Sequence, residues 1–130
     1  MMYIAVMKGA WTIIYYETAD GKCPIEEFIN SKSERNRAKI FNWLEQLEIH
    51  GPTLPRPYAD LLEDGIHELR IKLSGDHVRF LYFFCYRELV VITHAFTKAT
   101  GMVPKAEISE AKKCRKDFLA RNSERKARGH

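Results

Sequence analysis

Alternating apolar and polar positions divide the chain into short strands and longer helices. The stretch Trp11–Tyr16 is β-branched and aromatic, which predicts a first strand. Three more strands are predicted close together, at His67–Leu73, Val78–Tyr86 and Leu89–Phe96. Because short turns join antiparallel neighbours, these three strands predict an antiparallel sheet.

Three helices are predicted from apolar residues that recur at three- and four-residue spacing. The first two, Pro24–Ile29 and Ser33–Ile49, form an N-terminal helical hairpin in which Ser33 caps the second helix. The third is a C-terminal helix over Pro104–Leu119. The predicted fold class is therefore α+β, in the order β-α-α-β-β-β-α, with the helices on one face of the sheet.

Length and composition fit one domain over residues 1–130, with residues 1–10 and 121–130 as flexible ends. The chain is 45% hydrophobic and 12% aromatic, which supplies a core and argues against disorder. The longest apolar stretch has only the length of a strand, and the N-terminus lacks a signal-peptide pattern. We therefore expect no membrane partner and a cytoplasmic protein.

No residue pattern in the chain indicates a metal or cofactor site. The three cysteines, Cys23, Cys85 and Cys114, are far apart and show neither disulfide nor zinc spacing. The five histidines also lack the spacing of metal ligands. We therefore expect neither a metal nor a cofactor.

Positive charge is concentrated in the second half of the chain. Residues 66–130 hold 14 Lys/Arg against 7 Asp/Glu, whereas residues 1–65 hold 7 against 10. This imbalance favours a face that binds a polyanion, with nucleic acid as the first candidate. A solvated basic helix at the C-terminus would give the same balance.

Four cations lie on or beside the predicted strands. Arg70 and Lys72 are two residues apart and share a sheet face, Arg79 lies on the next strand, and Lys98 follows the last. Because burying such charges is unfavourable, we place them on a face that the helices leave open. We accordingly expect Arg79 to be reachable by solvent and to contribute little to stability. The alternative is that these four cations are separate, solvated surface side chains and do not cluster into a phosphate site.

Clustered cations of this kind would suit RNA cleavage. In that reaction a 2′-hydroxyl loses a proton and attacks the adjacent phosphorus, and cations stabilise the charge that builds up on the phosphate oxygens. Arginine makes paired contacts with such oxygens, and a lysine with a lowered pKa would accept the proton. Phe96 either stacks on an RNA base or packs in the core.

An ordered set of short segments extends over residues 11–120. It comprises Pro24–Phe28, Arg37–Ile40, Glu68–Ile71, Arg79–Phe84, His94–Lys98 and the helix opened by Pro104, with Glu107, Ile108 and Ala111. In this order the segments resemble the phage-derived HigB-like branch of the RelE toxin superfamily. No single segment is specific, but the ordered set is.

The resemblance implies the toxin of a type II toxin–antitoxin system, a metal-independent endoribonuclease that cleaves mRNA in the ribosomal A site. It implies mRNA and the ribosome as partners, and inhibition by a HigA-like helix-turn-helix antitoxin. By position, Arg70 and Arg79 resemble the cations that contact the scissile phosphate. Lys72 resembles a second strand cation that sometimes acts as the base, and Lys98 a basic residue after the last strand.

The resemblance also makes His94 a candidate RNA contact, beside the stacking candidate Phe96, because some relatives use a histidine near the position of His94. The chain departs from the family where Thr97-Lys98-Ala99 replaces a common pair of lysines. It also has no tyrosine after Lys98, where some RelE relatives carry a catalytic one. The identity of the general base therefore stays open.

Two other functions fit the same predicted fold. ParE-like toxins use it to bind DNA gyrase without catalysis, and a regulatory RNA-binding domain would need only the basic face. The combination of Arg70, Arg79 and Lys98 favours the nuclease, because a gyrase inhibitor needs no phosphate site.

Overall fold

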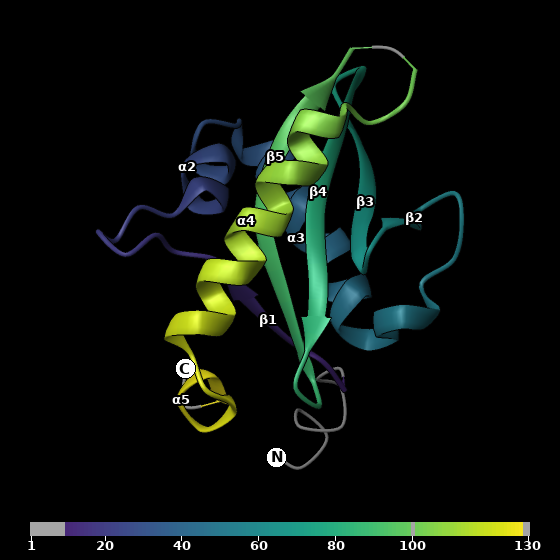
Figure 1. Ribbon diagram of the computed structural model, residues 1–130. Helices are drawn as coiled ribbons and strands as arrows, with labels where there is room; N and C mark the ends of the chain where they lie inside the picture. The colour runs from purple at the N-terminus through teal and green to yellow at the C-terminus, as the bar shows by residue number, and fades with distance from the viewer. Residues whose placement is uncertain (1–9, 100, 129–130) are drawn as a thin grey trace.

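The computed structural model describes residues 10–99 and 101–128, and five strands within these ranges form one sheet (Figure 1). The strands lie in the order β1-β5-β4-β3-β2. Their bounds are β1 Thr12–Tyr15, β2 Ala59–Glu63, β3 Ile66–Leu73, β4 Asp76–Cys85 and β5 Leu89–Lys98. The three predicted strands of the second half are confirmed as antiparallel neighbours.

Two features of the sheet differ from the prediction. The edge strand β1 pairs parallel with β5, so the sheet is mixed rather than wholly antiparallel. Strands β1 and β5 are not consecutive in the chain, because the helical hairpin and strands β2, β3 and β4 lie between them, and this provides the long connection that a parallel pair requires. The opposite edge is formed by β2, which the sequence did not predict. It pairs with β3 across Asp64-Gly65, two residues with positive φ that are typical of a tight hairpin turn.

The predicted helices are present, and two short ones accompany them. Their bounds are α2 Pro24–Asn30, α3 Glu34–His50, the 3₁₀ turn η1 Gly51–Thr53, α4 Lys105–Arg121 and α5 Glu124–Arg128. The hydroxyl of Ser33 accepts a hydrogen bond from the amide of Asn36, which confirms the predicted N-cap. Gly51 ends α3 with φ +52°, and a Cβ there would clash with the indole ring of Trp11.

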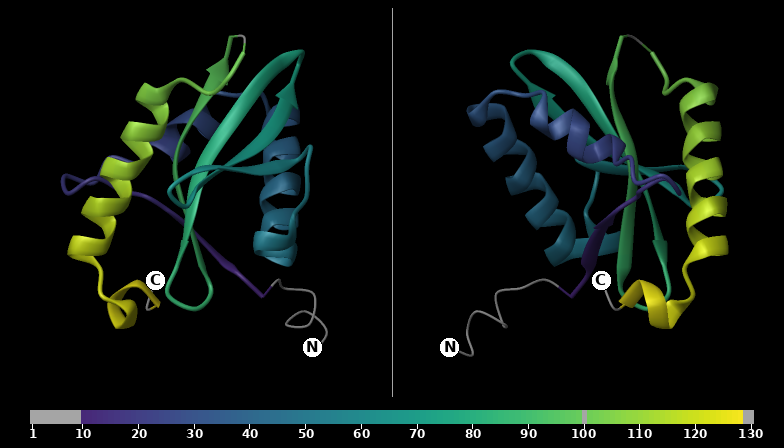
Figure 2. Two further views of the ribbon diagram at one scale, coloured as in Figure 1. Left: turned by 45° about the vertical axis from the view of Figure 1, so that its right-hand side comes forward. Right: turned by 90° about the vertical axis from the view of Figure 1, so that its left-hand side faces the viewer.

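Helices cover both faces of the sheet, so the expectation that they lie on one face is wrong (Figure 2). Helices α2 and α3 pack on one face and α4 packs on the other. The strand β4 shows why: Phe80 and Tyr82 are buried on the first face, while Leu81 and Phe83 are buried on the second. A strand that is apolar at successive positions is typical of a sheet covered on both sides.

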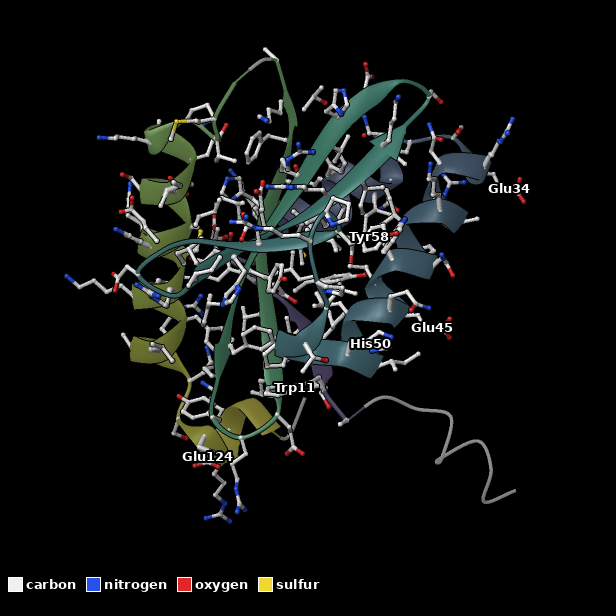
Figure 3. All side chains as sticks on the ribbon, turned by 90° about the vertical axis from the view of Figure 1, so that its right-hand side faces the viewer. Trp11, Glu34, Glu45, His50, Tyr58 and Glu124 are labelled. Atoms are coloured by element: carbon white, nitrogen blue, oxygen red, sulfur yellow. The ribbon has the colours of Figure 1, made fainter. Side chains whose placement is uncertain are left out.

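Helix α3 presents a polar side to solvent, where Glu34, Glu45 and His50 point away from the sheet (Figure 3). On its inner side, Trp43 stacks on Tyr58 with ring centroids 4.9 Å apart, which joins the segment before β2 to the helix. No helix in the described part of the chain is long and apolar enough to cross a membrane.

The C-terminal segment that was expected to be a flexible end contains α5. Asn122, between α4 and α5, is buried, and its carbonyl accepts a hydrogen bond from the hydroxyl of Tyr86. The guanidinium of Arg121 donates to the carboxylate of Asp117 one helical turn earlier. At the other end, residues 1–9 of the expected flexible segment lie outside the described residues, as do residues 129 and 130.

Candidate functional site

Strand pairing arranges the candidate site residues in three rows across β3, β4 and β5. The first row is Lys72, His77 and Lys98, the second is Arg70, Arg79 and Phe96, and the third is Glu68, Leu81 and His94. Residues directly opposite one another on neighbouring strands share a face and lie side by side. The four cations singled out from the sequence are therefore brought together on one face.

This is the face on which α4 packs, so the cations do not occupy an open sheet face as expected. Helix α4 begins beside the third row, where Oε1 of Glu107 lies 2.9 Å from Nε2 of His94. Farther along the helix, Ala111 and Phe118 are buried against the sheet. The first row lies beyond the start of α4, and there Lys72 and His77 are exposed.

A cavity of about 290 Å³ opens at this uncovered end of the face. It is lined by His77, Arg79, Lys98, Ala99 and Gly101. Among the described residues, its lining includes an arginine, a lysine and a histidine, and no carboxylate. The cavity thus has the charge and the hydrogen-bond donors to hold a phosphate.

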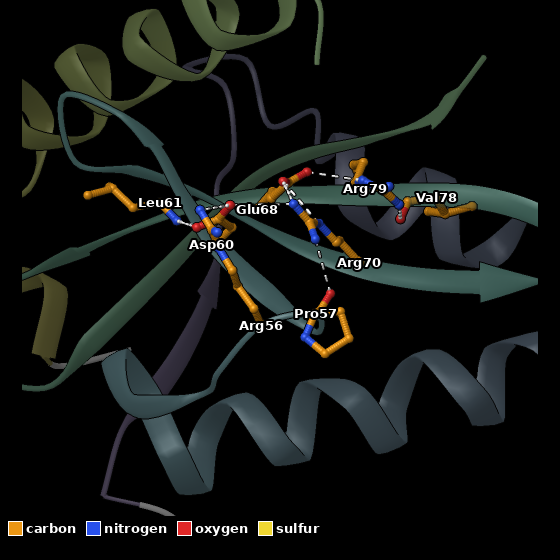
Figure 4. Close-up of polar contacts among 8 residues, drawn as sticks. All are labelled: Arg56, Pro57, Asp60, Leu61, Glu68, Arg70, Val78 and Arg79. Carbon is orange, nitrogen blue, oxygen red and sulfur yellow. Dashed lines mark hydrogen bonds and ion pairs between the residues drawn. The ribbon is translucent and has the colours of Figure 1, made fainter. Parts of the chain in front are cut away.

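A buried carboxylate joins the two arginines of the second row (Figure 4). Oε2 of Glu68 accepts from Nη2 of Arg70 at 2.9 Å and from its Nε at 3.1 Å. Oε1 of Glu68 lies 3.0 Å from Nε of Arg79. That second contact is an ion pair without hydrogen-bond alignment, because neither atom has a hydrogen-bond partner among the described residues.

The expectation that Arg79 is reachable by solvent is corrected by this arrangement. Only 8% of Arg79 is exposed, and Glu68 is 3% exposed. Burial lowers the pKa of the Arg79 guanidinium, the negative charge of Glu68 opposes this shift, and the positive charge of Arg70 adds to it. Arg79 therefore belongs to a buried charge network and is also one of the residues that line the cavity.

The network continues outward through Asp60 on β2. Its Oδ2 lies 3.4 Å from Nη2 of Arg70 and 3.0 Å from Nη2 of Arg56. The hydrogen bond from Arg56 lowers the pKa of the Asp60 carboxyl, so this group stays ionised. Arg70, with 32% of its side chain exposed, is thus held between two carboxylates.

His94 and Phe96, the candidate RNA contacts, are both held by the protein. Nδ1 of His94 lies 3.0 Å from the hydroxyl of Thr93, Nε2 faces Glu107, and 12% of the side chain is exposed. The Phe96 ring stacks on the His94 ring at 5.8 Å and packs against the apolar cluster under α4. This contact favours packing as the role of Phe96.

Three residues of the site were not identified from the sequence: Glu68, His77 and Asp60. Two of them carried a usable signal, because Glu68 is two residues before Arg70 and His77 is two residues before Arg79. A spacing of two on a strand places them on the same face as the cations. For Asp60, the strand that carries it was itself missed.

Other parts of the molecule offer less for this chemistry. A larger cavity of about 620 Å³ lies between β1 and α3, but its charged lining residues are Glu45 and Glu48. Burial raises the pKa of Cys85 to about 11 and that of Cys114 to about 12, so neither thiol is an activated nucleophile. Among the described residues, no three His, Cys, Asp or Glu side chains are grouped as they would be around a metal ion.

Comparison with protein families places these residues in a known group. The model of the phage-derived Gp49-like proteins (DUF891) matches residues 27–116 of the 130, a region that holds all three rows of the site. That family is associated with RelE-like toxins. A search of curated proteins found no match. The chain belongs to the phage-derived Gp49-like family.

Proposed function

We propose that this protein is the toxin of a type II toxin–antitoxin system, an endoribonuclease that cleaves mRNA on the ribosome. The observation that carries the proposal is the cavity lined by His77, Arg79 and Lys98, at the uncovered end of a cationic sheet face. Membership of a family associated with RelE-like toxins supports it. The finer assignment to the HigB-like branch is part of the proposal.

In the proposed reaction, the O–H bond of a ribose 2′-hydroxyl breaks as its oxygen forms a bond to the adjacent phosphorus. The bond from phosphorus to the 5′ oxygen then breaks, and that oxygen takes up a proton. The products are a 2′,3′-cyclic phosphate and a new 5′ hydroxyl. Arg79 and Lys98 stabilise the charge on the non-bridging oxygens, and Arg70 stands next to Arg79 in the same row. The cations fill this role without a metal ion.

Two side chains of the first row are candidates for the general base. Lys72 was singled out from the sequence, and His77 lies directly opposite it and lines the cavity. A neutral imidazole has a ring nitrogen that can accept a proton near neutral pH. Both ring nitrogens of His94 have partners within the protein, which makes His94 the weaker candidate.

The proposed partners are mRNA, the ribosome and an antitoxin with a HigA-like helix-turn-helix domain, all in the cytoplasm. The basic second half of the chain suits the phosphate backbones of RNA. We expect the antitoxin either to cover the site or to keep the bound toxin from reaching the ribosome by its bulk.

The test is to add the purified protein to translating ribosomes and to map new mRNA 5′ ends by primer extension. We expect cuts with the wild type, and a rate about a hundredfold lower with Lys98→Ala, which removes a transition-state contact. The matched control is Lys113→Ala on α4, where 79% of the side chain is exposed, and it should cut at the wild-type rate.

The same assay separates the alternatives. Growth arrest without RNA cleavage, accompanied by inhibition of DNA gyrase, would replace this proposal with a ParE-like toxin. RNA binding without either activity would indicate a regulatory RNA-binding domain. A ribonuclease activity that Lys98→Ala leaves unchanged would remove the cavity from the mechanism.

A further inference from the structure

The position of Glu68 calls for an explanation. A negative charge beside a phosphate site repels the phosphate, yet Glu68 lies in the same sheet face as the cations and contacts two of them. It is 3% exposed, so solvent does little to screen its charge. A carboxylate that weakens anion binding must therefore contribute something else to the site.

The pairing of β3 and β4 indicates what this contribution is. Arg70 and Arg79 stand directly opposite each other, and like charges at such a position repel. Oε2 of Glu68 forms an ion pair with Arg70 and Oε1 forms one with Arg79, so one carboxylate contacts both side chains at once. The shared negative charge of Glu68 thereby offsets the repulsion between the two arginines.

The contacts of Glu68 also decide which donors remain for a ligand. Each guanidinium carries five N–H groups. Glu68 engages the Nε side of both arginines, and Nη1 of Arg79 donates to the carbonyl of Val78 at 3.2 Å. Arg70 also donates from Nη1 to the carbonyl of Pro57 at 3.5 Å and from Nη2 to Oδ2 of Asp60 at 3.4 Å. Among the described contacts, this leaves one N–H group on Nη1 of Arg70 and three on the terminal nitrogens of Arg79, and it is Arg79 that lines the cavity.

We propose that Glu68 is the positioning residue of this site: it holds Arg70 and Arg79 as a rigid pair that grips a single phosphate of the RNA. The proposal rests on the proposed ribonuclease function. Glu68 itself touches neither the RNA nor the reacting atoms. Its contribution is the alignment of two cations with the charge that develops in the transition state.

This role predicts that binding and catalysis respond in opposite directions when the charge of Glu68 is removed. Glu68→Gln makes the site more positive, so the ribosome–mRNA complex should bind at least as tightly as to the wild type. The amide offers one acceptor oxygen, so it cannot hold both arginines. Misplacement of a catalytic group by about 1 Å lowers the rate by about a hundredfold, and we expect kcat to fall 10- to 100-fold with KM unchanged or lower.

Two further variants separate positioning from charge. Asp76→Asn removes the same charge from an exposed residue at the start of β4 that contacts neither arginine in the described structure. It should keep kcat within about twofold of the wild type, since the site geometry is untouched. Glu68→Asp keeps the charge but shortens the side chain, so it should restore only part of kcat. Full restoration by Glu68→Asp would reduce the role of Glu68 to neutralisation and overturn the proposal.

A measurement without catalysis tests the arrangement directly, in wild type as well as in folded variants. The Nε–H signals of Arg70 and Arg79 are followed by NMR while inorganic phosphate is added. In the wild type we expect both signals to shift together at the same phosphate concentration. In Glu68→Gln, with its fold checked by circular dichroism, we expect the two signals to respond separately. Signals that respond independently in the wild type would overturn the proposal, even if Glu68→Gln fails to fold.

The cleavage assay and the NMR titration together distinguish the ribonuclease function from the positioning role of Glu68. A wild type that cuts no mRNA but shows coupled arginine signals would refute the ribonuclease function and support the positioning role of Glu68 for another phosphate ligand. A wild type that cuts mRNA while Glu68→Gln keeps its kcat would refute the positioning role and leave the ribonuclease function in place.

Discussion

Replacement of Arg79 by alanine should destabilise the protein substantially. The truncation removes the ion-pair partner of Oε1 of Glu68, an atom that has no other partner among the described residues. The carboxylate itself cannot move to water, because Glu68 is 3% exposed. Arg79→Ala therefore leaves a buried negative charge that is only half compensated.

The expected loss in the free energy of unfolding depends on the contacts that Glu68 keeps in Arg79→Ala. Breaking a buried ion pair by removing one partner costs about 3–5 kcal/mol. Arg70 still donates twice to Oε2 of Glu68, which reduces this figure, so we expect a loss of about 2–3 kcal/mol in the free energy of unfolding. Lys98→Ala, which breaks no ion pair between described residues, should cost about 0.5 kcal/mol or less.

The assay is urea denaturation followed by the fluorescence of Trp11 and Trp43 and by circular dichroism. The double variant Glu68→Gln/Arg79→Met removes both buried charges and should be more stable than Arg79→Ala, because no unpaired carboxylate is left. A double-mutant cycle built on Glu68→Gln and Arg79→Met should give a coupling energy of about 1 kcal/mol or more. An Arg79→Ala protein within about 0.5 kcal/mol of the wild type would refute this reasoning.

This prediction affects how activity data are read. Lost growth arrest in Arg79→Ala would not separate lost catalysis from lost fold. Arg79→Lys keeps a cation beside Glu68 and is the better probe of the paired phosphate contact. It should stay folded and cut mRNA more slowly than the wild type.

Four further outcomes are expected. Ribosome binding should weaken steeply as salt rises from low to moderate concentration, and a flat dependence would contradict a basic RNA-binding face. Iodoacetamide at pH 8 should label Cys85 and Cys114 slowly in the folded protein and quickly in urea, as measured by mass spectrometry, because burial raises the pKa of both thiols. Burial and the hydrogen bond to Asp117 raise the pKa of Tyr16 to about 12 from the usual 10.0, and burial also raises the pKa of Tyr15, Tyr82 and Tyr86, so an ultraviolet titration should show several tyrosines that ionise late, with one fewer in Tyr16→Phe. Since the folded state favours the neutral phenol, stability should fall as pH rises from about 10 to 12, and Tyr16→Phe should reduce this loss, the remainder coming from the other tyrosines with raised pKa values.

Much of the fold could be read from local sequence. Ser33 caps α3 and Pro24 starts α2 because both act on backbone groups within one helical turn. The three antiparallel strands followed from alternation and short turns. Strand β2, which was not predicted, also carries a local signal, because Asp64-Gly65 is a typical hairpin turn between β2 and β3.

The cations of the site could be named from the sequence, but their surroundings could not. Spacing placed Arg70 and Lys72 on one face, yet the rows that join them to Arg79 and Lys98 depend on the register of three strands. The covering of that face by α4 likewise depends on where a distant helix packs. Because the position of α4 was not predictable, the sequence indicated that the whole cationic face is open, whereas the structure leaves only one end of that face uncovered.

The sequence by itself determined the order of the elements other than β2 and α5, the helix starts and the presence of a cationic strand surface, because these depend on neighbours within a few residues. Only the tertiary structure decided that Arg79 is buried, that Glu68 bridges two arginines, and that His77 joins the cavity. The physical reason is that burial and ion pairing depend on distances across the sheet. Those distances are set by strand register and helix packing together, and no local pattern encodes them.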